Sequence, residues 1–295
     1  MRSLTAVLAT LLALSFAPAA HAEAPVPLLW KVERDAGTVY LLGSIHVLKP
    51  TDYPLADSLE AAYDDAERLV FEVPPSAMAD PGLPAKMQSL ARFEDGRTLS
   101  EVISADTAEK LRAFLGSDAA VTAAQPFEPW YMTLNLAVMG VMQAGYNPQL
   151  GIDLHFMQRS AKDGKPTAGL ETVEDQLNTF DRTPIGEQDV MLGETLKSIG
   201  DLRKEFDTLH GHWRNGDDTA LVDQLVEKMQ EQTPEAYRLL NVQRNQAWLP
   251  QIEAMLSEQD DHLVVVGALH LIGEDGLVHL LQQRGLKVER ISQAP

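Results

Sequence analysis

The chain has 295 residues, of which 45% are hydrophobic, and its formal net charge is −19. This acidic balance disfavours nucleic acid and anionic membrane surfaces as partners. The sequence contains no cysteine, which excludes disulfides, a lipid-modified cysteine, thiol catalysis and cysteine-ligated zinc.

The first residues have the form of a secretory signal peptide. Arg2 supplies a positive charge, residues 4–17 are mostly apolar, and Ala20-His21-Ala22 is a small-x-small cleavage site. The apolar stretch is short for a membrane span. We therefore predict a signal peptide over residues 1–22 and export through the inner membrane to the periplasm. The mature chain, residues 23–295, is predicted to be one domain without a membrane span.

The start of the mature chain predicts a β-hairpin and then a strand–helix–strand unit. Residues 28–31 and 38–42 have strand patterns around a turn, and Gly43-Ser44-Ile45-His46 follows them. A helical pattern over residues 55–66 leads to an apolar strand, residues 69–73, which contains Glu72. This order predicts a βαβ unit with parallel strands, in which the strand of Glu72 pairs with the strand that leads to His46.

The middle of the chain, residues 99–256, is predominantly helical in pattern. Helices are expected over residues 104–115, 130–146, 151–160, 187–199, 221–229 and 235–256, and a strand over residues 165–170. Residues 130–146 are methionine-rich and nearly all apolar but too short to cross a bilayer, which predicts a buried core helix. The strand ends at Gly169-Leu170-Glu171-Thr172, where Thr172 and Asp175 resemble a capping box. Asp153 also has the position of a residue that starts a helix.

The C-terminal part returns to the order of the N-terminal part. Residues 263–266 predict a strand that ends at Gly267-Ala268-Leu269-His270, followed by a helix over residues 276–284 and a strand over residues 286–291. The predicted fold class is therefore α/β, with two βαβ-like units that carry Gly-x-x-His motifs in a central sheet and a large helical middle region.

His46 and His270 are the main candidates for chemistry, because each follows an apolar strand and a glycine. Sites in α/β sheets form at the C-terminal ends of strands, and neutral imidazole is a common ligand of divalent transition metals. Glu72 is a third candidate, since an unpaired carboxylate in an apolar strand is costly to bury. The alternatives are structural or surface histidines and an ion-paired or edge-strand glutamate.

Several segments together resemble the TraB/GumN family, which includes the Tiki metalloproteases. The similarity rests on residues 41–47, 70–72, Gly151-Ile152-Asp153, Gly169-Leu170-Glu171-Thr172, Arg244-Asn245 and residues 266–273. The resemblance implies an α/β core with helices between the two histidine motifs. From the Tiki branch it also implies a divalent-metal site of His46, Glu72 and His270, with Mn²⁺ or Co²⁺ as the ion and Zn²⁺ as a further candidate.

We predict an exported metal-dependent hydrolase, most simply a peptidase that acts on a peptide or protein in the envelope. Glu72 is the third ligand or the general base, Glu171 is the second candidate for the base, and Arg244 and Asn245 position the substrate or stabilise negative charge. One alternative is a non-catalytic periplasmic binding protein for a peptide, haem or an envelope component. Another is a structural envelope protein in which the motifs stabilise strand ends.

Overall fold

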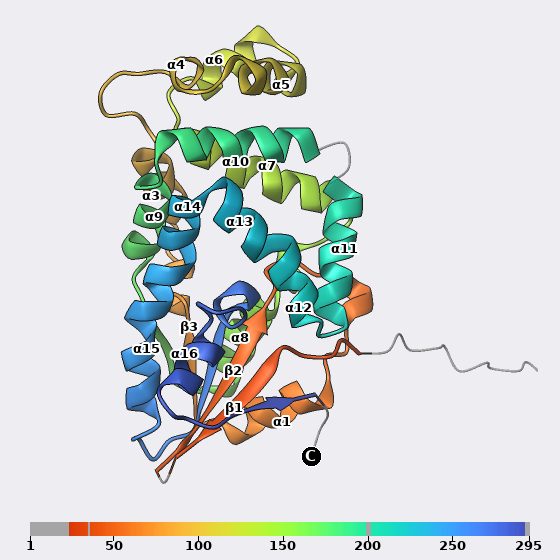
Figure 1. Ribbon diagram of the computed structural model, residues 1–295, viewed down its shortest axis with the longest axis vertical. Helices are drawn as coiled ribbons and strands as arrows, with labels where there is room; N and C mark the ends of the chain where they lie inside the picture. The colour runs from red at the N-terminus through yellow and green to blue at the C-terminus, as the bar shows by residue number, and fades with distance from the viewer. Residues whose placement is uncertain (1–23, 35, 199–201, 293–295) are drawn as a thin grey trace, which may run out of the picture.

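The computed structural model describes residues 24–34, 36–198 and 202–292. The predicted signal peptide lies outside these residues. One end of the molecule is built around a mixed six-stranded sheet, and helices from the middle of the chain form the other end (Figure 1). The strands are β1 (Leu29–Glu33), β2 (Thr38–Ser44), β3 (Arg68–Phe71), β4 (Thr167–Gly169), β5 (His262–Gly267) and β6 (Val288–Ile291).

Helices make up most of the remaining chain. The α-helices are α1 (Asp57–Asp65), α2 (Pro75–Met78), α3 (Leu83–Leu90), α4 (Leu99–Val102), α5 (Ala105–Leu115), α6 (Asp118–Ala124), α7 (Pro129–Gln143), α8 (Ile152–Asp163), α9 (Val173–Asp181), α10 (Ile185–Ser198), α11 (Leu202–Arg214), α12 (Asp218–Leu221), α13 (Glu227–Gln232), α14 (Pro234–Tyr237), α15 (Gln243–Met255) and α16 (Leu277–Gln283). The 3₁₀ helices are η1 (Pro50–Asp52), η2 (Pro148–Leu150) and η5 (Ala268–His270), and the π-helices are η3 (Val222–Val226) and η4 (Arg238–Val242). Within the described ranges, no helix has the length and apolar character needed to cross a membrane.

The sheet has the strand order β4-β3-β5-β2-β1-β6. The predicted hairpin is confirmed, because β1 and β2 pair antiparallel. β2 and β3 both pair parallel with β5 and not with each other, so the predicted pairing of the strands before His46 and Glu72 is wrong. The physical reason is that β5 is buried over nearly its whole length and takes the central position between them.

Two other local predictions are also corrected. β3 ends at Phe71, so Glu72 follows the strand instead of lying inside it, and Pro74 already caps α2. The methionine-rich helix α7 is only partly a core helix. It buries Trp130 and Leu136, but its opposite face exposes Met139 and Met142 in an apolar groove of about 770 Å³.

The hydrophobic core has a large part under the sheet and a smaller part among the helices. The large part includes Leu41 on β2, Phe71 on β3, Val264 on β5 and Trp248 on α15, all of which are almost completely buried. The smaller part joins α4, α5, α6, α7 and α10 at the far end of the molecule (Figure 1). Four parallel strands therefore have a rigid support, and their C-terminal ends lie at one edge of the sheet.

Candidate functional site

Each of the four parallel strands is followed closely by one candidate residue. His46 comes after β2, Glu72 after β3, Glu171 after β4, and His270 lies in η5 directly after β5. Because these strands run in the same direction, their C-terminal ends bring the four side chains to one edge of the sheet. The two Gly-x-x-His segments begin at the same edge of the sheet, because β2 and β5 pair parallel.

Gly267, at the end of β5, is the point where three of these side chains converge. A Cβ atom built on Gly267 would lie 3.2 Å from Glu72 Oε1, 3.6 Å from His270 Cδ2 and 4.0 Å from His46 Nε2. The Gly267 backbone N–H also donates to Glu72 Oε1 over 2.7 Å. A side chain at this position would therefore crowd the Glu72 carboxylate.

Arg244, from α15, is the cation at the centre of the buried half of the site. Its Nη2 donates to Glu72 Oε2 and to Glu171 Oε1, both over 2.6 Å, and its Nε also donates to Glu171. Its Nη1 donates to the Leu240 carbonyl over 3.0 Å and contacts His270 Nε2 at 2.9 Å. All five guanidinium N–H groups therefore have an acceptor inside the protein.

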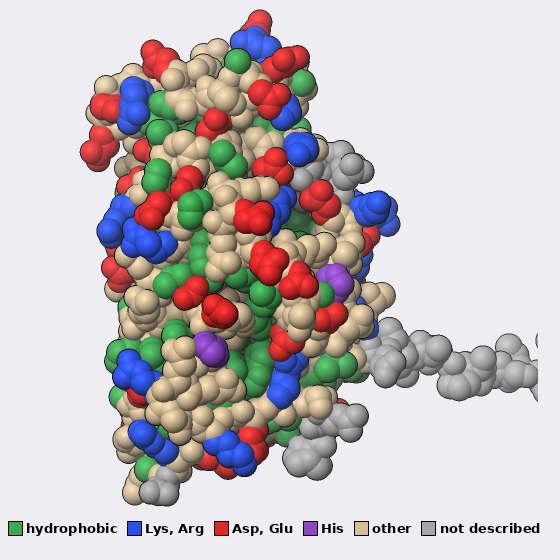
Figure 2. Space-filling model, viewed as in Figure 1, with side chains coloured by type: hydrophobic (Ala, Val, Ile, Leu, Met, Phe, Trp, Pro, Cys, Tyr) green, Lys and Arg blue, Asp and Glu red, His purple; other side chains and the backbone are tan. Residues whose placement is uncertain are grey.

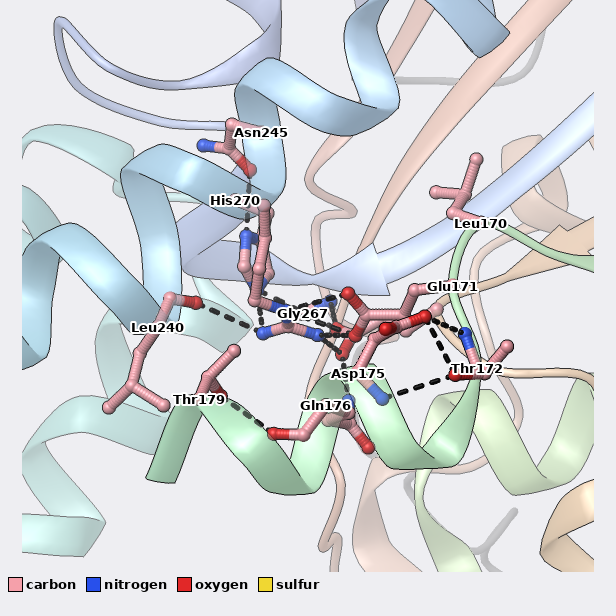
Figure 3. Close-up of polar contacts among 12 residues, drawn as sticks. Leu170, Glu171, Thr172, Asp175, Gln176, Thr179, Leu240, Asn245, Gly267 and His270 are labelled. Atoms are coloured by element: carbon pink, nitrogen blue, oxygen red, sulfur yellow. Dashed lines mark hydrogen bonds and ion pairs between the residues drawn. The ribbon is translucent and has the colours of Figure 1, made fainter. Parts of the chain in front are cut away.

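Asn245 fixes the orientation and the tautomer of His270. The Asn245 Nδ2 donates to the Asp275 carbonyl and to Asn241 Oδ1, and this leaves Asn245 Oδ1 to accept from His270 Nδ1 over 2.7 Å (Figure 3). With its proton on Nδ1, the neutral imidazole has its lone pair on Nε2 and accepts there from Arg244. Burial lowers the pKa of His270 to about 3, which keeps the ring neutral.

The pKa values of the two buried carboxylates are shifted in opposite directions. Burial by itself would raise the pKa of Glu72, but the neighbouring His270, Arg244 and His46 and the Gly267 N–H lower it to about 2. Burial raises the pKa of Glu171 above its ordinary value, and the bonds from Arg244 oppose that rise only in part. Glu72 is therefore ionised at neutral pH and is a weak proton acceptor.

His46 is held by Asp153 on the open side of the site. The His46 Nδ1 lies 3.0 Å from Asp153 Oδ1, and 66% of the His46 side chain is exposed. Asp153 is in the first turn of α8, whose cap Gly151 packs so closely on His46 that a Cβ would lie within 2.4 Å of the His46 carbonyl oxygen. The Asp153 carboxylate raises the pKa of His46 above its ordinary value.

A pocket of about 530 Å³ opens beside this histidine. Its polar lining consists of Ser44, His46, Glu72, Gln149, Asp153 and Gln176, and its apolar lining includes Phe71, Val73, Met78, Leu154, Met157 and Val265. Gln176, on α9, donates to Glu72 Oε2 over 2.8 Å. The Ser44 hydroxyl is buried and has no hydrogen-bond partner among the described residues. A ligand in the pocket could accept a hydrogen bond from it.

The predicted site residues therefore divide into two connected groups. His46 and Glu72 line the pocket, whereas Glu171, Arg244, Asn245 and His270 lie behind Glu72 and do not line it. The capping box predicted next to Glu171 is confirmed, because Thr172 and Asp175 form reciprocal hydrogen bonds at the start of α9 (Figure 3). The sequence did not predict the pocket residues Ser44 and Gln176. The contact between Asp153 and His46 was also not foreseen, and no local pattern signals any of these three.

A divalent cation needs several donor atoms that point to one position. His46 and Glu72 have suitable atoms on the pocket side, and a carboxylate on Nδ1 is common for histidines that bind metals. His270 does not fit as a third ligand, because its Nε2 lone pair already accepts from Arg244. Among the described residues, no group of three or more histidine, aspartate or glutamate side chains is arranged to hold a metal ion.

Comparison with known proteins gives a family match over almost the whole described chain. The model of the TraB/PrgY/gumN family matches residues 28–290. The uncharacterized protein YbaP of Escherichia coli K12 is 25% identical over 250 residues, which cover 82% of this chain and 87% of YbaP. An uncharacterized protein of Treponema pallidum is 22% identical over 275 residues, which cover 88% of this chain and 81% of that protein. No solved structure matches the chain.

Proposed function

Because the chain belongs to the TraB/PrgY/gumN family, we propose that it is a hydrolase that cleaves a peptide or protein in the pocket beside His46. The observation that carries the proposal is the pairing of an exposed imidazole with a carboxylate inside a pocket, with Nδ1 of His46 at 3.0 Å from Asp153. An imidazole oriented in this way is a suitable general base for water.

In the proposed reaction, His46 Nε2 takes a proton from the attacking water. Asp153 holds the ring in the orientation that presents Nε2 and stabilises the imidazolium that forms. His46 suits this role better than Glu72, because the pKa of Glu72 is lowered to about 2 and both of its oxygens already accept hydrogen bonds. The role of base that the sequence suggested for Glu72 or Glu171 is therefore transferred to His46.

The pocket also suggests the kind of substrate. Its apolar lining, which includes Phe71, Val73, Leu154 and Met157, would accept an apolar side chain next to the bond that is cleaved. Acidic side chains are scattered over the face of the molecule shown in Figure 2, and the chain has a net charge of −19. This charge would repel acidic peptides.

A metal-dependent form of the same reaction is the second candidate. The carboxylate on Nδ1 of His46 favours it, because this arrangement also orients metal-binding histidines. His46 and Glu72 would hold Mn²⁺, Co²⁺ or Zn²⁺, and such an ion would make a bound water more acidic. In this form His46 is a ligand and not the base.

The experiment uses the purified chain without residues 1–22, freed of metal with a chelator. Cleavage of quenched fluorescent peptides with apolar or acidic side chains is measured with and without added Mn²⁺. We expect cleavage of apolar peptides, and a loss of about 10²–10⁴-fold in His46→Ala, as for other general bases. His279→Ala is the matched control, because His279 does not line this pocket and its ring hydrogen-bonds to the exposed residue Gln283.

Each outcome separates the candidates. Activity without metal supports His46 as the base, and activity only with Mn²⁺ supports the metal-dependent form. Full activity in His46→Ala contradicts both. Tight peptide binding without any cleavage favours the alternative of a non-catalytic binding protein. Export is tested separately by N-terminal sequencing of the protein from a periplasmic fraction, where we expect the chain to begin at Glu23.

A further inference from the structure

The buried half of the site is an arrangement of two carboxylates and one imidazole around a single guanidinium. Arg244 has 10% of its side chain exposed, and the side chains that it contacts, Glu72, Glu171 and His270, are exposed by no more than 12%. Buried carboxylates are stable only when a cation compensates their charge. Arg244 supplies that compensation, and it uses all five of its N–H groups to do so.

We infer that Arg244 is the resident cation of this half of the site, and that it keeps divalent ions away from Glu72, Glu171 and His270. These three side chains offer carboxylate oxygens and an imidazole lone pair, which are the donors that Mn²⁺ and Zn²⁺ prefer in proteins. In the folded chain each of the three accepts a hydrogen bond from an Arg244 N–H. A metal ion and the guanidinium therefore compete for the same atoms.

The support behind His270 makes this competition specific. Asn245 is completely buried and holds the proton of His270 on Nδ1, so the Nε2 lone pair always points away from Asn245. Such a lone pair, buried beside an anionic carboxylate, requires a donor or a cation as its partner. With Arg244 in place these side chains are not arranged around a common point as metal ligands. Removal of the guanidinium should leave space in which they can approach one another around a cation.

The inference rests on the proposed function in one respect, because it assigns ligand binding to the His46 side of Glu72 and charge compensation to Arg244. The test therefore uses the His46→Ala background, in which the pocket side has lost its imidazole. Thermal unfolding of His46→Ala and of His46→Ala/Arg244→Met is followed with a chelator and then with Mn²⁺ or Zn²⁺. Cleavage activity is not part of the readout.

We expect the Arg244→Met change to lower the Tm by about 10 °C in the chelator, because it leaves buried charge uncompensated. Mn²⁺ or Zn²⁺ at 100-fold above its Kd should then raise the Tm of the double variant by about 5–10 °C, with no such rise in His46→Ala alone. If the double variant is unfolded in the chelator, the same ions should fold it, as seen by circular dichroism.

Two further variants keep the result specific. Arg244→Lys in the same background retains a cation and should not respond to the ions. Arg238→Met is the matched control, because Arg238 lies less than two helical turns away and forms an exposed ion pair with Glu235. The inference would be overturned if Mn²⁺ or Zn²⁺ changed the Tm equally with and without Arg244. It would also be overturned if the ions did not raise the Tm of the Arg244→Met double variant. A response of the unmodified chain that disappears in His46→Ala bears only on the metal-dependent form of the proposed function.

Discussion

Asp153 lies 3.0 Å from the Nδ1 of His46 and connects the first turn of α8 to the loop that follows β2. The contact joins residues that are 107 positions apart in the chain. It orients the imidazole and raises its pKa, and both effects bear on how the pocket works.

The rate of hydrolysis should rise with pH. Asp153 raises the pKa of His46, so the ring is protonated below that raised pKa and becomes a base only as the pH increases through it. In Asp153→Asn the pKa falls, and the rising limb of the pH–rate profile should move to lower pH. The maximal rate should also fall by about 10²-fold, because the ring loses its orientation. A rising limb at an unchanged pH in the variant would contradict this role of Asp153.

Gly151→Ala should separate Asp153 from His46. A Cβ at residue 151 would lie 2.4 Å from the His46 carbonyl oxygen, so the start of α8 has to shift and lose the bond from Ile152 N to Ile45 O. We expect a lower Tm and a large loss of peptide cleavage. Gly186→Ala is the control, since no atom lies within 4 Å of its Cβ and alanine stabilises a helix by about 0.5–1 kcal/mol relative to glycine. Equal Tm values for the two variants would show that the start of α8 can shift without a loss of stability.

Ser44→Ala should affect ligand binding and not folding. Ser44 and Ser58 are each 3% exposed, and each has an Oγ without a hydrogen-bond partner among the described residues. Removal of an unpaired buried hydroxyl costs no hydrogen bond inside the protein. We therefore expect both alanine variants to unfold at the same urea concentration as the parent. Only Ser44→Ala should raise KM, by about 2–10-fold, because Ser44 lines the pocket and Ser58 does not. Equal KM values would exclude a contact from Ser44 to the substrate.

Asp52 should make the protein sensitive to acid. It is fully buried, accepts from Lys49 N and His210 Nε2, and contacts Arg214. Burial by itself would raise its pKa, but these partners lower the pKa below its ordinary value of 3.8. The stability from this carboxylate is therefore present above pH 3.8 and is lost as the pH falls through the lowered pKa.

Asp52→Asn should reduce the free energy of unfolding at pH 7 by about 3–5 kcal/mol, because it removes the buried charge that pairs with Arg214 and accepts hydrogen bonds from Lys49 N and His210. Urea titrations at pH 7 and at pH 3 provide the measurement, and the difference between parent and variant should shrink at the lower pH. Asp106→Asn is the control, since Asp106 forms an exposed pair with Lys110 that is worth about 0.5 kcal/mol. A loss at Asp52 no larger than that at Asp106 would be incompatible with this account.

Local sequence patterns predicted the strands and the residues at their ends. The apolar runs before His46 and His270 and the capping box at Thr172 depend on neighbours in the chain, so periodicity and spacing reveal them. The position of β5 between β2 and β3 could not be read in this way, because strand order is decided by packing between distant segments.

The enclosed environment of Arg244 also could not be predicted from the sequence. A helical arginine is usually solvated, yet this one is almost fully enclosed. It follows a π-helical turn, η4, which supplies the Leu240 carbonyl and the Asn241 side chain to the site. Such turns have no reliable sequence signal and occur often at functional sites.

The central place of β5 has a consequence for the order in which the molecule can be built. Gly267 and Glu72 bond to each other across 195 positions of sequence. During synthesis from the N-terminus, β2 can pair with β1 and β3 can pair with β4, but these two pairs cannot be joined until β5 arrives with the last part of the chain. The contacts that define the sheet are therefore of high contact order and form slowly. A growing chain contains no assembled site. The pocket and the buried ion pairs form together when β5 pairs with β2 and β3.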